Sequence, residues 1–158
     1  MPEALTAPAY TLRPAIAEDY PFLYGLHVAC MKECVAQTWG WDDAVQQAMF
    51  HESFAPERSQ IVIVDEQAVG VFVAERRPTE WFVGNIAIAP QIQGQGLGAA
   101  LLRDLLATAA HDGLPTRLQV LLVNPARQLY ERLGFAVVGE TPTYCLMLAP
   151  AHTLQEEG

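Results

Sequence analysis

Residues 86–99 read IAIAPQIQGQGLGA, and the rest of the chain is arranged around this stretch. Its first four residues are apolar, Pro90 breaks the run, and glycines follow at positions 94, 96 and 98. Leucines then recur at helical spacing from Leu97 to Leu106, which predicts an amphipathic helix. The stretch therefore predicts a strand, a glycine-rich loop and a helix, in that order.

The three glycines place no side chain where the first unpaired amides of the helix point outward. An anionic group can approach such a backbone closely, so the loop suits a phosphate. It is not a nucleoside-triphosphate loop, because Ala99 and Ala100 follow Gly98 where Lys and Ser or Thr are needed. The dinucleotide fingerprint fails too, since Ala99 stands at its third glycine position. A purely structural turn is the alternative.

Two segments resemble the signatures of the GNAT superfamily of acyl-CoA-dependent N-acetyltransferases. Residues 93–98, QGQGLG, are similar to the family's Gln/Arg-x-x-Gly-x-Gly/Ala motif. Residues 124–135, NPARQLYERLGF, resemble its Asn…Ala…Tyr…Gly-Phe segment. Two motifs in the family's order are more specific than one, and the order of elements from about Tyr10 to Leu148 is also similar.

The hydrophobic pattern predicts an α/β (α+β) fold with one domain over residues 10–149. The resemblance implies a GNAT-like, mostly antiparallel central sheet with one parallel βαβ crossover that splays to hold CoA. We expect a flexible leader at residues 1–9 and a frayed tail at 150–158. Strands are expected at residues 10–13, 60–64, 69–74, 81–88, 118–123, 135–138 and 144–148. Helices are expected from about 18 to 37, 42 to 54, 97 to 112 and 125 to 133.

Composition limits the class of protein. A chain of 158 residues is long enough for one core. No apolar run approaches the roughly 20 residues that span a bilayer, and Met1-Pro2-Glu3 does not open a secretory signal, so we expect a cytoplasmic protein. The cysteines, Cys30, Cys34 and Cys145, are odd in number and lack the spacing of a zinc or redox site. We expect buried thiols and no metal.

The charge is distributed unevenly along the chain. Residues 91–135 contain four arginines and three acids, whereas the remainder contains five basic and fifteen acidic residues. The expected cofactor segment is therefore near neutral, and the remainder repels nucleic acid and attracts cations. A cationic amine suits this field. An ordinary acidic surface is the alternative.

The resemblance implies a binding site for acetyl-CoA. The pantetheine arm would pair with the backbone of the strand that ends near Ala89, and the pyrophosphate would lie on the amides of residues 94–99. The implied cofactor-binding residues are Ile86, Ala87, Ile88, Gln93, Gly94, Gln95, Gly96, Leu97, Gly98, Ala99, Asn124 and Arg127.

Tyr130 matches the family's thiol-protonating tyrosine, and its usual pKa near 10 keeps the phenol protonated at neutral pH. An ordinary half-buried aromatic is the alternative. The position that aligns with the family's strand glutamate holds the apolar Phe82, so the motif does not identify a catalytic base. Glu80, two residues earlier, and Glu75 are the candidates, and water or a solvated turn acid are the alternatives.

In similar proteins the first two helices form the acceptor wall. His27, Met31, Trp39 and Trp41 are the candidate acceptor contacts, although two tryptophans beside a glycine turn also suit a helix–helix corner.

The leading hypothesis is an N-acetyltransferase that moves an acetyl group from acetyl-CoA to a primary amine of a small cationic molecule or a peptide N-terminus. A CoA-binding sensor or interaction module of the same fold is the alternative. Acetylation of transfer RNA fits poorly with the acidic balance. A homodimer is compatible with the sequence, which carries no motif for an oligomer.

Overall fold

The computed structural model describes residues 7–151, so the leader expected at residues 1–6 and the tail expected at 152–158 lie outside the described residues. The chain forms two compact units. Unit 1 comprises Met1–Val73 and Asn85–Leu97, and unit 2 comprises Ala74–Gly84 and Gly98–Gly158. The single domain expected over residues 10–149 remains a prediction.

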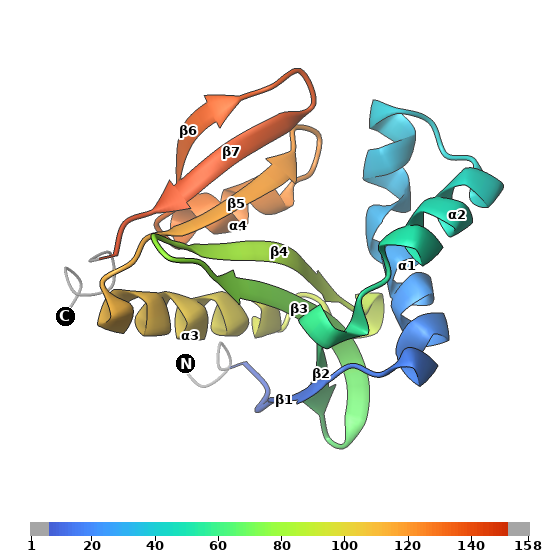
Figure 1. Cartoon of the computed structure of the whole chain (residues 1–158), viewed down its shortest axis with the longest axis horizontal. Coiled ribbons are helices and arrows are strands. Elements are labelled where there is room, and N and C mark those ends of the chain that lie inside the picture. The colour runs from blue at the N-terminus through green and yellow to red at the C-terminus, as the bar shows by residue number, and fades with distance from the viewer. Residues whose placement is uncertain (1–6, 152–158) are drawn as a thin grey trace. The chain divides into compact units, whose positions relative to one another are not determined.

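Seven strands form one mixed sheet, as the sequence predicts, in the order β1-β2-β3-β4-β5-β7-β6 (Figure 1). Along the chain, β3 and β4 each run from one unit into the other. The strands are β1 Thr11–Pro14, β2 Gln60–Val64, β3 Gln67–Arg76, β4 Trp81–Ile88, β5 Thr116–Leu121, β6 Ala136–Glu140 and β7 Tyr144–Ala149.

In unit 1, β2 pairs antiparallel with both β1 and β3. The β2–β3 turn consists of Asp65 and Glu66, both with positive φ, which is the geometry of a tight two-residue hairpin. Val62 pairs with Gly70 and Ile63 with Ala68, so Val69 is an extra residue in β3. This bulge leaves the Val69 carbonyl to accept the Ala89 N–H at 2.7 Å.

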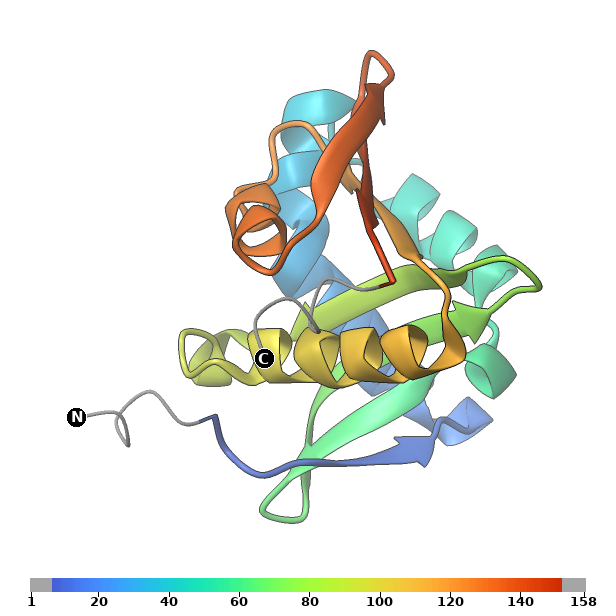
Figure 2. The same cartoon turned by 90° about the vertical axis from the view of Figure 1, so that its left-hand side faces the viewer.

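In unit 2, β4 and β5 run parallel and pair at Trp81 with Thr116 and at Phe82 with Arg117. The crossover between them is α3, Leu97–Asp112, which confirms the predicted strand–helix–strand unit. β7 pairs antiparallel with β5 and with β6. Figure 2 shows the long α3 and the β6–β7 hairpin with the short helix α4, Ala126–Arg132, beside it.

The leucine stripe on α3 is buried, as predicted: Leu97, Leu101, Leu102, Leu105 and Leu106 are each at most 7% exposed. The helix ends at Gly113, whose φ of +72° is the left-handed conformation that terminates helices.

In unit 1, α1 spans Tyr20–Thr38 and α2 spans Asp43–Ser53. Asp42 caps α2 by accepting the Val45 N–H at 3.0 Å, as its position predicts. Leu23 and Leu26 of α1 pack into one buried cluster with Ile61 and Val71 of the strands. The core of unit 1 thus lies between α1 and the β2–β3 hairpin.

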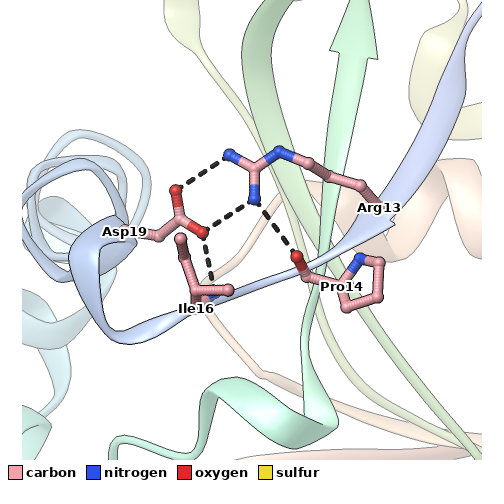
Figure 3. Close-up of polar contacts among 4 residues, drawn as sticks. All are labelled: Arg13, Pro14, Ile16 and Asp19. Atoms are coloured by element: carbon pink, nitrogen blue, oxygen red, sulfur yellow. Dashed lines mark hydrogen bonds and ion pairs between the residues drawn. The ribbon is translucent and has the colours of Figure 1, made fainter.

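An ion pair fixes the entry into α1. Both terminal nitrogens of the Arg13 guanidinium donate to the Asp19 carboxylate at 2.9 Å, and Asp19 also accepts the Ile16 N–H at 2.8 Å (Figure 3). The same guanidinium donates to the Pro14 carbonyl at 3.1 Å. These contacts join the end of β1 to the 3₁₀ turn Ala17–Asp19 that precedes α1.

Several element boundaries differ from the prediction by one or two residues, and two of them lie near the candidate site. β5 ends at Leu121 and not at Val123, because the Asn124 N–H bonds the Leu121 carbonyl in a turn that leaves Val123 44% exposed. α4 begins at Ala126, one residue later than expected. The N-cap is therefore Pro125 and not Asn124 as predicted, although the Asn124 side chain still accepts the Ala126 N–H at 2.9 Å just before the helix.

Candidate functional site

The glycine loop joins β4 to α3. Gly94 and Gly96 have φ values of +83° and +85°, a conformation that L side chains rarely adopt, so glycine is required at both positions. A Cβ atom on Gly94 or Gly98 would meet no atom within 4 Å, so the backbone is open there. Helix α3 begins at Leu97, and the first amides of a helix have no partner within the helix itself.

The end of β4 presents backbone groups to two sides. The Ala89 N–H bonds β3 through the Val69 carbonyl. Because successive residues of a strand point their backbone groups to opposite edges, those of Ile86 and Ile88 face away from β3. This edge matches the pairing that the resemblance implies for pantetheine.

Two side chains donate hydrogen bonds to the Ile88 carbonyl oxygen. Gln93 Nε2 donates to this oxygen at 2.8 Å and Cys30 Sγ at 3.2 Å. Gln93 was predicted as a cofactor residue, whereas Cys30 was expected to be a buried structural thiol and this contact was not predicted. Cys30 follows His27 by three residues on α1, and that helical spacing is the signal that places it on the same face.

Tyr130 lies on α4 in unit 2 and is 8% exposed. Its ring meets Phe135 edge-to-face with 6.1 Å between centroids. Burial raises the pKa of Tyr130 above its usual value of 10, so the phenol keeps its proton at neutral pH and can donate it. Arg127, on the same helix, pairs with Glu131 at 3.3 Å across one helical turn.

Glu80 immediately precedes β4, which begins at Trp81. One oxygen of its carboxylate accepts Arg117 Nε at 2.9 Å, and the other lies 3.5 Å from an Arg77 nitrogen. The Arg77 guanidinium in turn lies 4.2 Å from the Phe82 ring centroid. Both carboxylate oxygens thus have cationic partners. The second candidate, Glu75, lies on β3 and also pairs with Arg77, at 3.4 Å.

The residues expected to contact the acceptor, on α1 and the following turn, differ in their contacts and in their exposure to solvent. The Trp41 ring lies 5.9 Å from His27 and 5.7 Å from the Lys32 ammonium. Trp39 is 58% exposed, so it does not fill a helix–helix corner. Met31 is half-buried on α1.

A pocket of about 430 Å³ lies between α1 and α2 within unit 1. Phe50 stacks on His27 at 5.3 Å and forms one wall, and His27 bonds Gln46 at 3.3 Å. The pocket residues on α2 were not predicted from the sequence, because α2 carries no transferable motif. The lining residues are His27, Gln46, Met49, Phe50, Glu52 and Ser53.

Within residues 7–151, no three His, Cys, Asp or Glu side chains gather closely enough to hold a metal ion. No helix in the same part of the chain is long and apolar enough to cross a membrane.

The fold and the loop define the class: an α/β protein with a mixed sheet and a parallel crossover that begins with a glycine-rich turn. A model of the acetyltransferase (GNAT) family matches residues 20–135. The chain belongs to this family.

Two relatives are similar over part of their length. The [ribosomal protein bS18]-alanine N-acetyltransferase of Haemophilus influenzae is 36% identical over 84 residues, which are 52% of this chain and 58% of that protein. The chain thus spans less than two thirds of this relative. The 5-NmdU N-acetyltransferase of Pseudomonas phage PaMx11 is 33% identical over 104 residues, 63% of this chain and 73% of that protein.

Solved structures share the fold. The PaiA N-acetyltransferase of Thermoplasma acidophilum, in complex with coenzyme A, has a TM-score of 0.74 at 15% identity, covering 90% of this chain and 99% of that one. The ribosomal-protein-S18-alanine N-acetyltransferase of Escherichia coli has a TM-score of 0.63 at 22% identity, with coverage of 90% and 94%. At these identities the likeness concerns the fold alone.

Proposed function

We propose that the protein is an N-acetyltransferase that moves the acetyl group of acetyl-CoA to a primary amine, carried by a small cationic molecule or a peptide N-terminus. The glycine loop is the observation that carries this proposal. Gly94 and Gly96 hold positive φ angles, and the loop leads directly into α3. Amides at such a helix start stabilise a pyrophosphate without a lysine.

The cofactor contacts follow from the family motif. In unit 1, the backbone of Ile86 and Ile88 would pair with the pantetheine amides, and Gly94, Gln95, Gly96 and Leu97 would contribute pyrophosphate amides. In unit 2, Gly98 and Ala99 would add the next amides of α3, with Asn124 and Arg127 as further contacts.

The transfer requires three functions: a neutral amine, a stabilised oxyanion and a proton for the leaving thiolate. As the C–N bond forms, a backbone amide of residues 86–88 would stabilise the oxyanion. As the C–S bond breaks, Tyr130 would protonate the sulfur, a role supported by the raised pKa of its phenol. The proton lost by the amine would pass to water or to Glu80.

The acceptor side is proposed to be the pocket on α1 and α2, with Met31, Trp39 and Trp41 of the same segment. The acidic balance outside residues 91–135 favours a cationic acceptor, and Glu52 contributes a carboxylate to the pocket. One relative is named for an alanine of a ribosomal protein, which supports a peptide N-terminus. The cytoplasm and a homodimer remain expectations.

A steady-state assay of thiol release tests the proposal. Wild-type protein with acetyl-CoA and a panel of cationic amines and alanine-starting peptides should release free CoA. Tyr130→Phe should lower kcat by about 10²-fold or more and leave CoA affinity within twofold, because the phenol acts only as the bond breaks. Tyr144→Phe on β7 is the matched control.

Two outcomes contradict the proposal in different ways. CoA binding without turnover of any acceptor would favour the sensor alternative. Turnover that survives Tyr130→Phe would remove the assigned acid and leave the fold's function intact.

A further inference from the structure

The Ile88 carbonyl is unusual among the backbone groups of unit 1, because two side chains from distant parts of the sequence share it. Gln93 Nε2 lies 2.8 Å from this oxygen and Cys30 Sγ lies 3.2 Å from it. The two donors also approach each other, with 3.8 Å between the nitrogen and the sulfur. A carbonyl oxygen has two lone pairs, so both acceptor positions are occupied.

The backbone on the loop side of Ile88 is held as well. The Ala89 N–H bonds the Val69 carbonyl at 2.7 Å, the Ile92 N–H bonds the Ala89 carbonyl at 3.0 Å, and the Gln93 N–H bonds the Pro90 carbonyl at 3.2 Å. The Gln93 side chain then folds back to Ile88 and closes the turn of residues 88–93. The glycine loop begins at the next residue.

Cys30 suits the role of a neutral donor. It lies on α1, so its bond ties that helix to the end of β4 within unit 1. Burial raises the pKa of the Cys30 thiol, which keeps the S–H proton at neutral pH. Cys34, one turn further along α1, is buried and makes no side-chain hydrogen bond to the loop within residues 7–151, so the helix supplies its own comparison residue.

We propose that Cys30 is a positioning residue of the acetyl-CoA site: with Gln93 it clamps the Ile88 carbonyl and so fixes the direction in which the glycine loop leaves β4. The proposal rests on the proposed function. It follows that the Gln93 amide is engaged with Ile88, so that the backbone amides of residues 94–99 carry the pyrophosphate. Pantetheine would then pair with Ile86 and with the N–H of Ile88, and not with the Ile88 carbonyl.

The test uses the full chain and two readouts. The first is the carbonyl ¹³C shift of Ile88 in the ligand-free protein, measured by NMR with ¹³C-carbonyl isoleucine and ¹⁵N-alanine. The second is calorimetric affinity for CoA, together with kcat and KM for acetyl-CoA. The variants are Cys30→Ala, which removes the donor, Cys30→Ser, which restores a shorter one, and Cys34→Ala as the control on the same helix.

Cys30→Ala should move the Ile88 carbonyl shift and raise both the Kd for CoA and the KM for acetyl-CoA about 3- to 10-fold, the range of one hydrogen bond, with kcat within twofold. Cys30→Ser should recover part of the affinity, and Cys34→Ala should change neither the shift nor the Kd. In the double variant Cys30→Ala/Gln93→Ala, the fold-loss of CoA affinity should exceed the product of the fold-losses in the two single variants, because either donor alone still holds the carbonyl.

An unchanged Ile88 shift in Cys30→Ala would overturn the clamp. A changed shift with unchanged CoA affinity would overturn its role in the cofactor site. If wild-type protein binds no CoA, the proposed function fails along with that role, whereas the carbonyl shift still decides whether the clamp exists.

Discussion

Gly70 of β3 lies so close to β4 that a Cβ atom at this position would be 2.6 Å from the Ala87 carbonyl oxygen. The same atom would be 3.0 Å from the Ile88 side chain. Both strands belong to unit 1 in this region, and Ile88 carries the clamped carbonyl. The glycine therefore permits the close approach of β3 to the segment that we expect to meet pantetheine.

Replacing this glycine should destabilise the protein. In Gly70→Ala the methyl group would displace backbone, and we expect the free energy of unfolding to fall by about 1–3 kcal/mol, as for other overpacked sites. Urea denaturation measures the change. Gly139→Ala is the control, because a Cβ atom there would meet only the Leu146 side chain at an ordinary 3.5 Å. Equal losses in the two variants would contradict the account.

A substitution at Thr116 should stabilise the protein. Its hydroxyl is buried without a hydrogen-bond partner, on a residue that is 1% exposed at the start of β5. Thr116→Val keeps the shape and removes the unsatisfied group, so it should stabilise the protein by about 1 kcal/mol. Thermal unfolding gives the measurement. Thr141→Val should do the reverse, because the Thr141 hydroxyl accepts the N–H groups of Thr143 and Tyr144.

The Arg13–Asp19 pair predicts a pH-dependent stability. The hydrogen bonds that the Asp19 carboxylate accepts, first from Arg13 and then from the Ile16 N–H, hold the pKa of Asp19 below its usual 3.8. A lowered native pKa means that the stabilisation is present above about pH 4 and is lost as the pH falls through the native value. The Arg13 side chain is 42% exposed, so solvent screening limits the contribution to about 1 kcal/mol.

Asp19→Asn should therefore lower the free energy of unfolding at pH 7, and the difference from wild type should shrink towards pH 3. Denaturant titrations at the two pH values measure both effects. Arg127→Gln, which breaks an exposed pair on α4, is the control and should show no resolvable change at either pH. A difference between Asp19→Asn and wild type that does not shrink as the pH falls below about 4 would show that the charge of Asp19 is not responsible.

Variants of Glu80 distinguish a catalytic base from a member of a structural ion pair. Since Arg117 and Arg77 hold its two oxygens, we expect Glu80→Gln and Arg117→Gln to lower the melting temperature similarly and to leave kcat within about threefold. Water would then accept the amine proton. A loss of 10²-fold or more in kcat for Glu80→Gln alone would instead identify the base.

Much of the fold was predictable because its signals are local. The leucine spacing of α3, the capping position of Asp42 and the glycine at 113 each act within one helical turn, and each prediction was confirmed. The end of β5 was misplaced because Leu122 and Val123 are apolar like the strand, whereas a backbone bond to Leu121 starts a turn there. Apolarity alone does not mark a strand end.

The site was less predictable where contacts join distant residues. The motif identified the glycine loop, but Cys30 is 58 residues from Ile88, and no local pattern indicates that contact. The bond between Arg117 and Glu80 is likewise a tertiary feature, since the two residues lie 37 positions apart. The pocket on α1 and α2 depends on how the two helices pack, which their sequences do not encode as a motif.

The central claim, that the glycine loop binds acetyl-CoA, is tested most directly by thermal unfolding with and without the ligand. A ligand that binds only the native state at 100 times its Kd adds about 2.7 kcal/mol, or roughly 5–10 °C for a chain of this size. We predict this rise with acetyl-CoA and none with a small acetyl thioester that lacks the pyrophosphate. An unchanged melting temperature at millimolar acetyl-CoA would contradict the account.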